Sequence, residues 1–215
     1  MNISNTTFAY NTLLSEKDAL FYLSEKNVRA NHREIAINFT EIKVSQNFCT
    51  GKACFEVFAV TRRNDLVLVT EGVVFENNVA AGESIFDIHG FSNLSINFKT
   101  TKFQRNTGRA VKLHDGDSMD LKIEKSVFSK NGIPDSRTKL EEDYDGMDRG
   151  AVVVDGFTKN ALVCLHGSKF NSNKGRSGGA CAFINILGSL LLNINNCRFV
   201  KNEGWLSGEI GRAHV

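Results

Sequence analysis

Two aspartates, Asp115 and Asp155, each stand directly before a glycine at the end of an apolar, strand-like segment. His89 and Leu187 hold the same position in two further segments, so stacking of these segments would place the two carboxylates on neighbouring strands. Carboxylate pairs at such a separation hydrolyse or eliminate on sugars. Asp-Gly is also ordinary turn chemistry. The two aspartates are therefore candidates for catalysis, although a structural role in the turns explains them more simply.

An acidic segment offers a second kind of chemistry. Glu141, Asp143 and Asp145 precede Gly146 in the order of the first half of a calcium-binding loop. The glutamate that closes such a loop with two oxygens is missing, because Val152 stands in its place. The segment predicts a solvated acidic loop, and calcium is the one cofactor that it could bind.

The 5 cysteines leave the redox compartment open. Cys49 and Cys54 are near enough in sequence to bridge a short turn in an oxidising compartment, while Cys164, Cys181 and Cys197 stand where small apolar residues would serve. No paired CxxC or histidine spacing indicates zinc.

Composition excludes several classes of protein. The 26 basic and 24 acidic residues nearly cancel and form no basic block, so nucleic acid is not an expected partner. No apolar run is long enough to span a bilayer. A hydrophobic content of 41% supports one sizeable core, and plentiful glycine with a single proline favours strands joined by tight turns.

The elements that would position these residues form a repeat, aromatic-x-x-Asn, which from Phe75 onward recurs every 25 to 29 residues with one longer step of 42 residues. A segment with apolar residues at alternate positions precedes each copy, and a glycine- or alanine-led strand follows it. Residues 133–149 form an insertion in the longer step, and residues 13–34 fit the repeat least and are expected to be irregular. The copies are Phe75/Asn78, Phe103/Asn106, Phe128/Asn131, Phe170/Asn173 and Phe199/Asn202, with Phe8/Asn11 and a degenerate Val44/Asn47 before them.

Units of this size with two or three short strands cannot bury a core alone and must stack on their neighbours. The sequence predicts an all-β fold, a right-handed single-stranded parallel β-helix over residues 1–209, incomplete at one or both ends. The phenylalanines then form an internal aromatic ladder and the asparagines a turn ladder. The spacing required for leucine-rich repeats or a β-propeller is absent.

The segment from Phe170 to Cys181, which contains Asn173 and Gly178-Gly179-Ala180, resembles the paired FxxN and GGA(I/L/V) repeats of chlamydial polymorphic outer membrane proteins and of eukaryotic β-helix proteins like them. Cys181 departs from the aliphatic residue of that pattern. The resemblance covers about residues 66–209. It implies a pectin-lyase-like superhelix and surface-exposed adhesion, and it carries over no catalytic residue.

Residues 210–215 match the translation of a widely used sequencing adapter and are interpreted as an artefact outside the fold.

The expected function is therefore non-catalytic: an extracellular or cell-surface protein that binds a protein or glycan through its solenoid faces and loops. The alternative is a polysaccharide lyase or glycoside hydrolase of the pectin-lyase-like fold. That alternative requires at least three titratable groups to converge on the outward face of the stacked strands.

Overall fold

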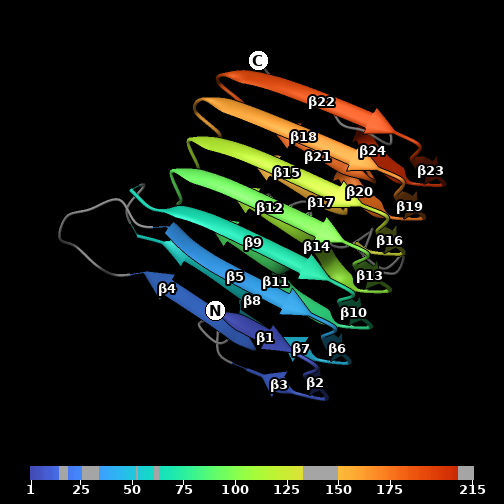
Figure 1. Cartoon of the computed structure of the whole chain (residues 1–215). Helices are drawn as coiled ribbons and strands as arrows, with labels where there is room; N and C mark the ends of the chain where they lie inside the picture. The colour runs from blue at the N-terminus through green and yellow to red at the C-terminus, as the bar shows by residue number, and fades with distance from the viewer. Residues whose placement is uncertain (15–18, 26–33, 52, 61–62, 133–149, 208–215) are drawn as a thin grey trace.

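Alternating apolar residues form strands here because every second side chain can face a shared interior while the others face outward. The computed structural model describes residues 1–14, 19–25, 34–51, 53–60, 63–132 and 150–207 (Figure 1). Parallel strands from successive coils pair in register and wind into a solenoid, so the prediction of an all-β parallel β-helix is confirmed. Strands of one sheet lie side by side in chain order, from blue to red in Figure 1.

The first sheet faces the viewer in Figure 1, and its strands between the two ends of the sheet bury alternate residues, as Leu94, Ile96 and Phe98 show on β12. Its seven strands are β1 (Asn2–Ser4), β5 (Glu34–Thr40), β9 (Asp65–Glu71), β12 (Asn93–Lys99), β15 (Ser118–Glu124), β18 (Asn160–His166) and β22 (Ser189–Asn195).

The second sheet runs along the right edge in Figure 1 and carries the aromatic anchors at the centre of its short strands. Its seven strands are β2 (Thr7–Ala9), β6 (Lys43–Ser45), β10 (Val74–Glu76), β13 (Lys102–Gln104), β16 (Val127–Ser129), β19 (Lys169–Asn171) and β23 (Arg198–Val200).

The third sheet closes each coil. It contains β3 (Thr12–Leu13), β4 (Phe21–Glu25), β7 (Phe48–Cys49), β8 (Ala53–Ala59), β11 (Val79–His89), β14 (Thr107–His114), β17 (Val152–Asp155) and β21 (Cys181–Ile184). A two-stranded pair, β20 (Lys174–Ser177) and β24 (Glu203–Ser207), lies beside the last coils. Within residues 13–34, expected to be irregular, β4 is a regular strand that pairs with β8.

The aromatic anchors stack face to face through the interior. Successive ring centroids from Phe75 through Phe103, Phe128 and Phe170 to Phe199 lie 4.6, 5.1, 4.9 and 4.9 Å apart. The first four of these side chains are fully buried. Stacked aromatic pairs add about 0.5–1.5 kcal/mol each beyond their area burial, so this ladder is a major source of stability.

The anchor asparagines form a continuous hydrogen-bonded ladder at the turn after the second sheet. Each Nδ2 donates to the Oδ1 of the next asparagine at 2.8–3.0 Å, from Asn11 through Asn47, Asn78, Asn106, Asn131 and Asn173 to Asn202. From Asn47 onward, the other Nδ2 proton reaches the carbonyl of an anchor residue one coil back, as from Asn106 to Phe75. The ladder satisfies polar groups that burial would otherwise leave unpaired.

The turn after the third sheet differs from the simple glycine turn that the sequence suggests. The residue with positive φ is Gly90 or Gly156 in two coils, but Asp115 and Asn185 in two others, where glycine follows later. Aspartate and asparagine tolerate the left-handed region. Gly188 is required for a different reason, because a Cβ there would lie 1.5 Å from the carbonyl oxygen of Lys159.

Candidate functional site

Successive side chains on the strands of the third sheet lie on opposite faces, so a group of titratable side chains points outward. On β11, Phe86 points into the aromatic interior, so Asp87 and His89 point away from it. The register pairs His89 with His114 on β14 and with Phe58 on β8, and it pairs Asp87 with Glu56 on β8. We call Glu56, Asp87, His89, His114 and Asp115 the histidine–carboxylate cluster.

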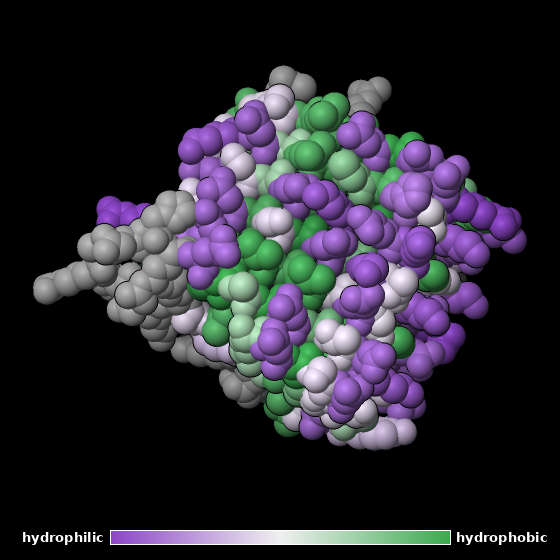
Figure 2. Space-filling view, viewed as in Figure 1, coloured by the Kyte–Doolittle hydropathy of each residue, from purple (hydrophilic) through white to green (hydrophobic). Residues whose placement is uncertain are grey.

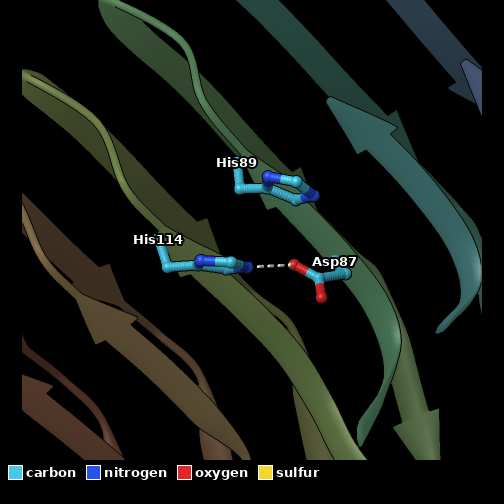
Figure 3. Close-up of side chains that lie close together, drawn as sticks. All are labelled: Asp87, His89 and His114. Atoms are coloured by element: carbon cyan, nitrogen blue, oxygen red, sulfur yellow. Dashed lines mark ion pairs between the residues drawn. The ribbon is translucent and has the colours of Figure 1, made fainter. Parts of the chain in front are cut away.

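The cluster is held by direct contacts between imidazoles and carboxylates, and Figure 3 shows the contact between His114 and Asp87. His114 Nε2 lies 2.9 Å from Asp87 Oδ1, and His114 Nδ1 lies 2.7 Å from Asp115 Oδ2. His89 Nε2 lies 3.4 Å from Glu56 Oε1. His114 therefore bridges one buried and one exposed carboxylate, while His89 contacts a third.

Ring stacking fixes both imidazoles. The rings of His89 and His114 stack with centroids 4.6 Å apart, and Phe58 stacks on the other face of His89 at 5.2 Å. Each ring is thereby restricted in rotation, which holds the nitrogens near the carboxylates.

Burial sets the electrostatics of the cluster. Asp87 is only 1% exposed. Burial by itself would raise the pKa of Asp87, but contact with His114 and the charges of His114, Lys112 and His89 lower that pKa below its ordinary value. Burial likewise opposes protonation of His114, yet the contacts with Asp87 and Asp115 raise the pKa of His114 despite the charge of Lys112. The two shifts describe a pair that is most stable with both partners charged.

The structure separates the two aspartates that the sequence aligned. Asp155 is in register with His114, whereas Asp115 follows one residue later in the turn with a φ of 56°. The column is thus His89, His114 and Asp155, and the assumed alignment of Asp115 with Asp155 was wrong by one position. Asp115 contacts His114, and Asp155 Oδ1 accepts a hydrogen bond from Asn185 Nδ2 at 2.9 Å. The calcium candidates Glu141, Asp143 and Asp145 lie outside the described residues.

A second group, which the sequence analysis missed, lies on the outward side of the second sheet. Lys102, Lys169 and Arg198 occupy one column of strand positions, with Val127 between the first two. Lys130 and Lys201 occupy equivalent positions in the adjoining turn. All five side chains are exposed. We call Lys102, Lys130, Lys169, Arg198 and Lys201 the basic strip.

Carboxylates are scarce along this strip. Among the described strands of the second sheet, only β10 carries one, Glu76, and it pairs with Arg105. None of the five basic-strip residues forms an ion pair with a carboxylate in the described part of the chain. The right edge of the molecule, where Figure 1 places this sheet, is correspondingly hydrophilic in Figure 2.

The strip borders a shallow hollow at its carboxyl-terminal end. Its volume is about 190 Å³, and it is lined by Lys169, Phe170, Asn171, Arg198 and Val200. The sequence did hold a signal for the strip, because basic residues recur directly before the anchor phenylalanine or the anchor asparagine. Stacking the repeats turns those distant positions into one line.

Cys49 and Cys54 form a disulfide between β7 and β8, with their Cα atoms 5.5 Å apart. Cys164, Cys181 and Cys197 are free thiols, and burial raises the pKa of Cys181. The described residues contain no helix of the length and apolarity needed to cross a membrane.

The stacked parallel sheets define the chain as a protein of the parallel β-helix class. No protein-family model matches the sequence, and a search of curated proteins found no match either.

Proposed function

We propose that this chain is part of a non-catalytic extracellular or cell-surface protein that binds an acidic glycan along the basic strip of its second sheet. The observation that carries the proposal is the strip itself: five exposed basic side chains in two adjoining columns, without a carboxylate partner among the described residues. Uncompensated charge on a rigid surface attracts a ligand of opposite sign.

The geometry favours a linear polyanion. Neighbouring strands of a sheet lie about 4.8 Å apart, so charges from successive coils recur at short, regular intervals along the solenoid. An acidic polysaccharide presents carboxylates or sulfates at intervals along an extended chain. Single-stranded nucleic acid fits less well, because Phe103, Phe128 and Phe170 are fully buried and offer no stacking surface to bases.

Two further observations support a surface location. The Cys49–Cys54 disulfide is typical of proteins in oxidising compartments. The FxxN and GGA-like repeat, with its resemblance to polymorphic outer membrane proteins and to pectin-lyase-like superhelices, supports a role in adhesion.

The enzymatic alternative, a polysaccharide lyase or glycoside hydrolase, is favoured by the histidine–carboxylate cluster. Its groups meet the requirement that at least three titratable side chains converge on an outward strand face. We rank it second because Asp87 is almost inaccessible and both imidazoles are engaged by carboxylates of the protein. Release of reducing ends or of unsaturated products from an acidic polysaccharide would establish it.

The test is a binding titration with polygalacturonate and with heparin, used as a carboxylated and a sulfated probe. We expect the double variant Lys169→Gln/Arg198→Gln to lose at least tenfold in affinity. Lys99→Gln/Lys122→Gln removes the same charge from the first sheet and serves as the matched control. Equal loss in both double variants, or no binding of either polymer at low salt, would overturn the proposal.

A further inference from the structure

We propose that Asp87, His89 and His114 form a binding site for a divalent first-row transition-metal ion, with zinc as the reference ion. One carboxylate oxygen of Asp87 and one ring nitrogen from each histidine all lie within 4.8 Å of one another. The three residues come from two neighbouring strands, and Figure 3 shows their side chains gathered on the same side of the ribbon.

The donor set selects the class of metal. Two imidazole nitrogens with one carboxylate oxygen suit zinc and its first-row neighbours, whereas calcium and magnesium prefer oxygen alone. Ligands bound at about 2.0–2.2 Å to a tetrahedral ion lie about 3.3–3.6 Å apart, so donor atoms separated by as much as 4.8 Å must close by about 1 Å. Rotation of the side chains, without a shift of the backbone, is the adjustment that this site requires.

The burial of one ligand oxygen favours a metal ion at this site. Asp87 is 1% exposed, and its Oδ1 lies 2.9 Å from His114 Nε2. His114 is therefore an ion-pair partner of this oxygen in the metal-free protein. Buried carboxylate oxygens are normally satisfied. A metal ion bound by Oδ1 and the ring nitrogens would take the place of that ion pair and keep the oxygen satisfied.

The surroundings resemble the outer shell of a metal site. Metal-bound histidines commonly donate their second ring N–H to a carboxylate, which fixes the tautomer and the ring orientation. Asp115 Oδ2 occupies that position at His114 Nδ1, 2.7 Å away, and leaves Nε2 directed towards Asp87. Glu56, 3.4 Å from His89 Nε2, is near enough to serve as a fourth ligand.

Both positive and negative side chains surround the site, and the carboxylates outnumber the lysine, which favours binding of a cation. Lys112 is in register with Asp87 and opposes metal binding, while Glu56, Asp87, Asp115 and Asp155 supply four carboxylates on this face. The burial of Asp87 indicates a structural role, in which the ion ties β11 to β14, and the inference does not depend on glycan binding.

The experiment is a titration of the metal-stripped protein with Zn²⁺ by calorimetry and with Co²⁺ by visible absorption. We expect one ion per chain, cobalt bands typical of nitrogen and oxygen ligands, and at least tenfold weaker binding in Asp87→Asn, His89→Ala and His114→Ala. His166→Ala is the control, because His166 is an exposed histidine on the first sheet.

Circular dichroism checks that each variant folds. If a variant does not fold, modification of the wild-type protein with diethyl pyrocarbonate tests the site instead. Zinc should protect His89 and His114 from modification but not His166. The inference is overturned if the wild-type protein binds no stoichiometric metal, if the three variants bind as tightly as His166→Ala, or if zinc leaves His89 and His114 reactive.

Discussion

Asn131 Nδ2 donates to Asn173 Oδ1 at 3.0 Å although 42 residues separate the two asparagines. This step contains the insertion at residues 133–149, yet its hydrogen bond matches those of the shorter steps, such as Asn78 to Asn106 at 3.0 Å. The anchor phenylalanines of the same coils remain stacked as well. The ladder therefore sets the coil spacing, and the insertion leaves it unchanged.

Replacing an asparagine of the ladder should destabilise the protein more than size alone predicts. Asn106 donates to Phe75 and Asn131 and accepts at Oδ1 from both the backbone and the side chain of Asn78. Asn106→Ala leaves these partners unpaired, at a cost of about 1–3 kcal/mol. Asn106→Asp retains the acceptor but places a charged oxygen against two carbonyl groups, so its cost should be at least as large.

Urea denaturation measures both variants, with the exposed Asn195→Ala as a control expected within about 0.5 kcal/mol of wild type. Losses below about 0.5 kcal/mol for both Asn106 variants would show that the ladder contributes nothing.

Truncating a phenylalanine of the aromatic ladder should leave a cavity that destabilises the protein. Phe128 is fully buried between Phe103 and Phe170, so Phe128→Ala should lower the free energy of unfolding by about 3–5 kcal/mol. Phe128→Leu fills most of the space and should cost clearly less. Phe48→Ala, at a side chain 39% exposed, is the comparison variant. A Phe128→Ala cost equal to that of Phe48→Ala would contradict the buried stack.

The metal-free protein should have a stability window set by Asp87 and His114. The pKa of His114 is raised above its ordinary 6.5, so its contribution is fully present below that pH and is lost as pH rises through the raised value. The pKa of Asp87 is lowered below 3.8, so its contribution is present above that pH and is lost as pH falls further. Both contributions are therefore complete between pH 3.8 and 6.5.

Unfolding in the presence of a chelator, measured across pH for wild type and His114→Gln, checks this window. The difference in unfolding free energy between the two proteins should be largest inside it and shrink on both sides. A difference that does not change with pH would show that the ion pair makes no contribution.

The repeat alone was enough to predict the parallel coils, because period-two segments and recurring Phe-x-x-Asn report which residues face inward. The position of the turn after the third sheet was predicted less accurately from the sequence. Asp115 adopts the left-handed conformation itself, so the glycine beside it did not mark the turn. That slip of one residue hid the pairing of His89 with His114, since a one-residue change of register exchanges the two faces of a strand.

The basic strip was missed for a different reason. Lys102, Lys169 and Arg198 are far apart in a chain whose charges nearly cancel, and net charge carries no information about their alignment. Only stacking brings them into one column.

Lysine footprinting tests the central claim, that the second sheet is the ligand-binding face, most directly. The protein is acetylated with a lysine-reactive reagent, with and without saturating acidic polysaccharide, and each site is quantified by mass spectrometry. The account predicts strong protection of Lys102, Lys130, Lys169 and Lys201, and unchanged reactivity of Lys99 and Lys122 on the first sheet. Protection of Lys99 and Lys122 with the basic strip still reactive would contradict it.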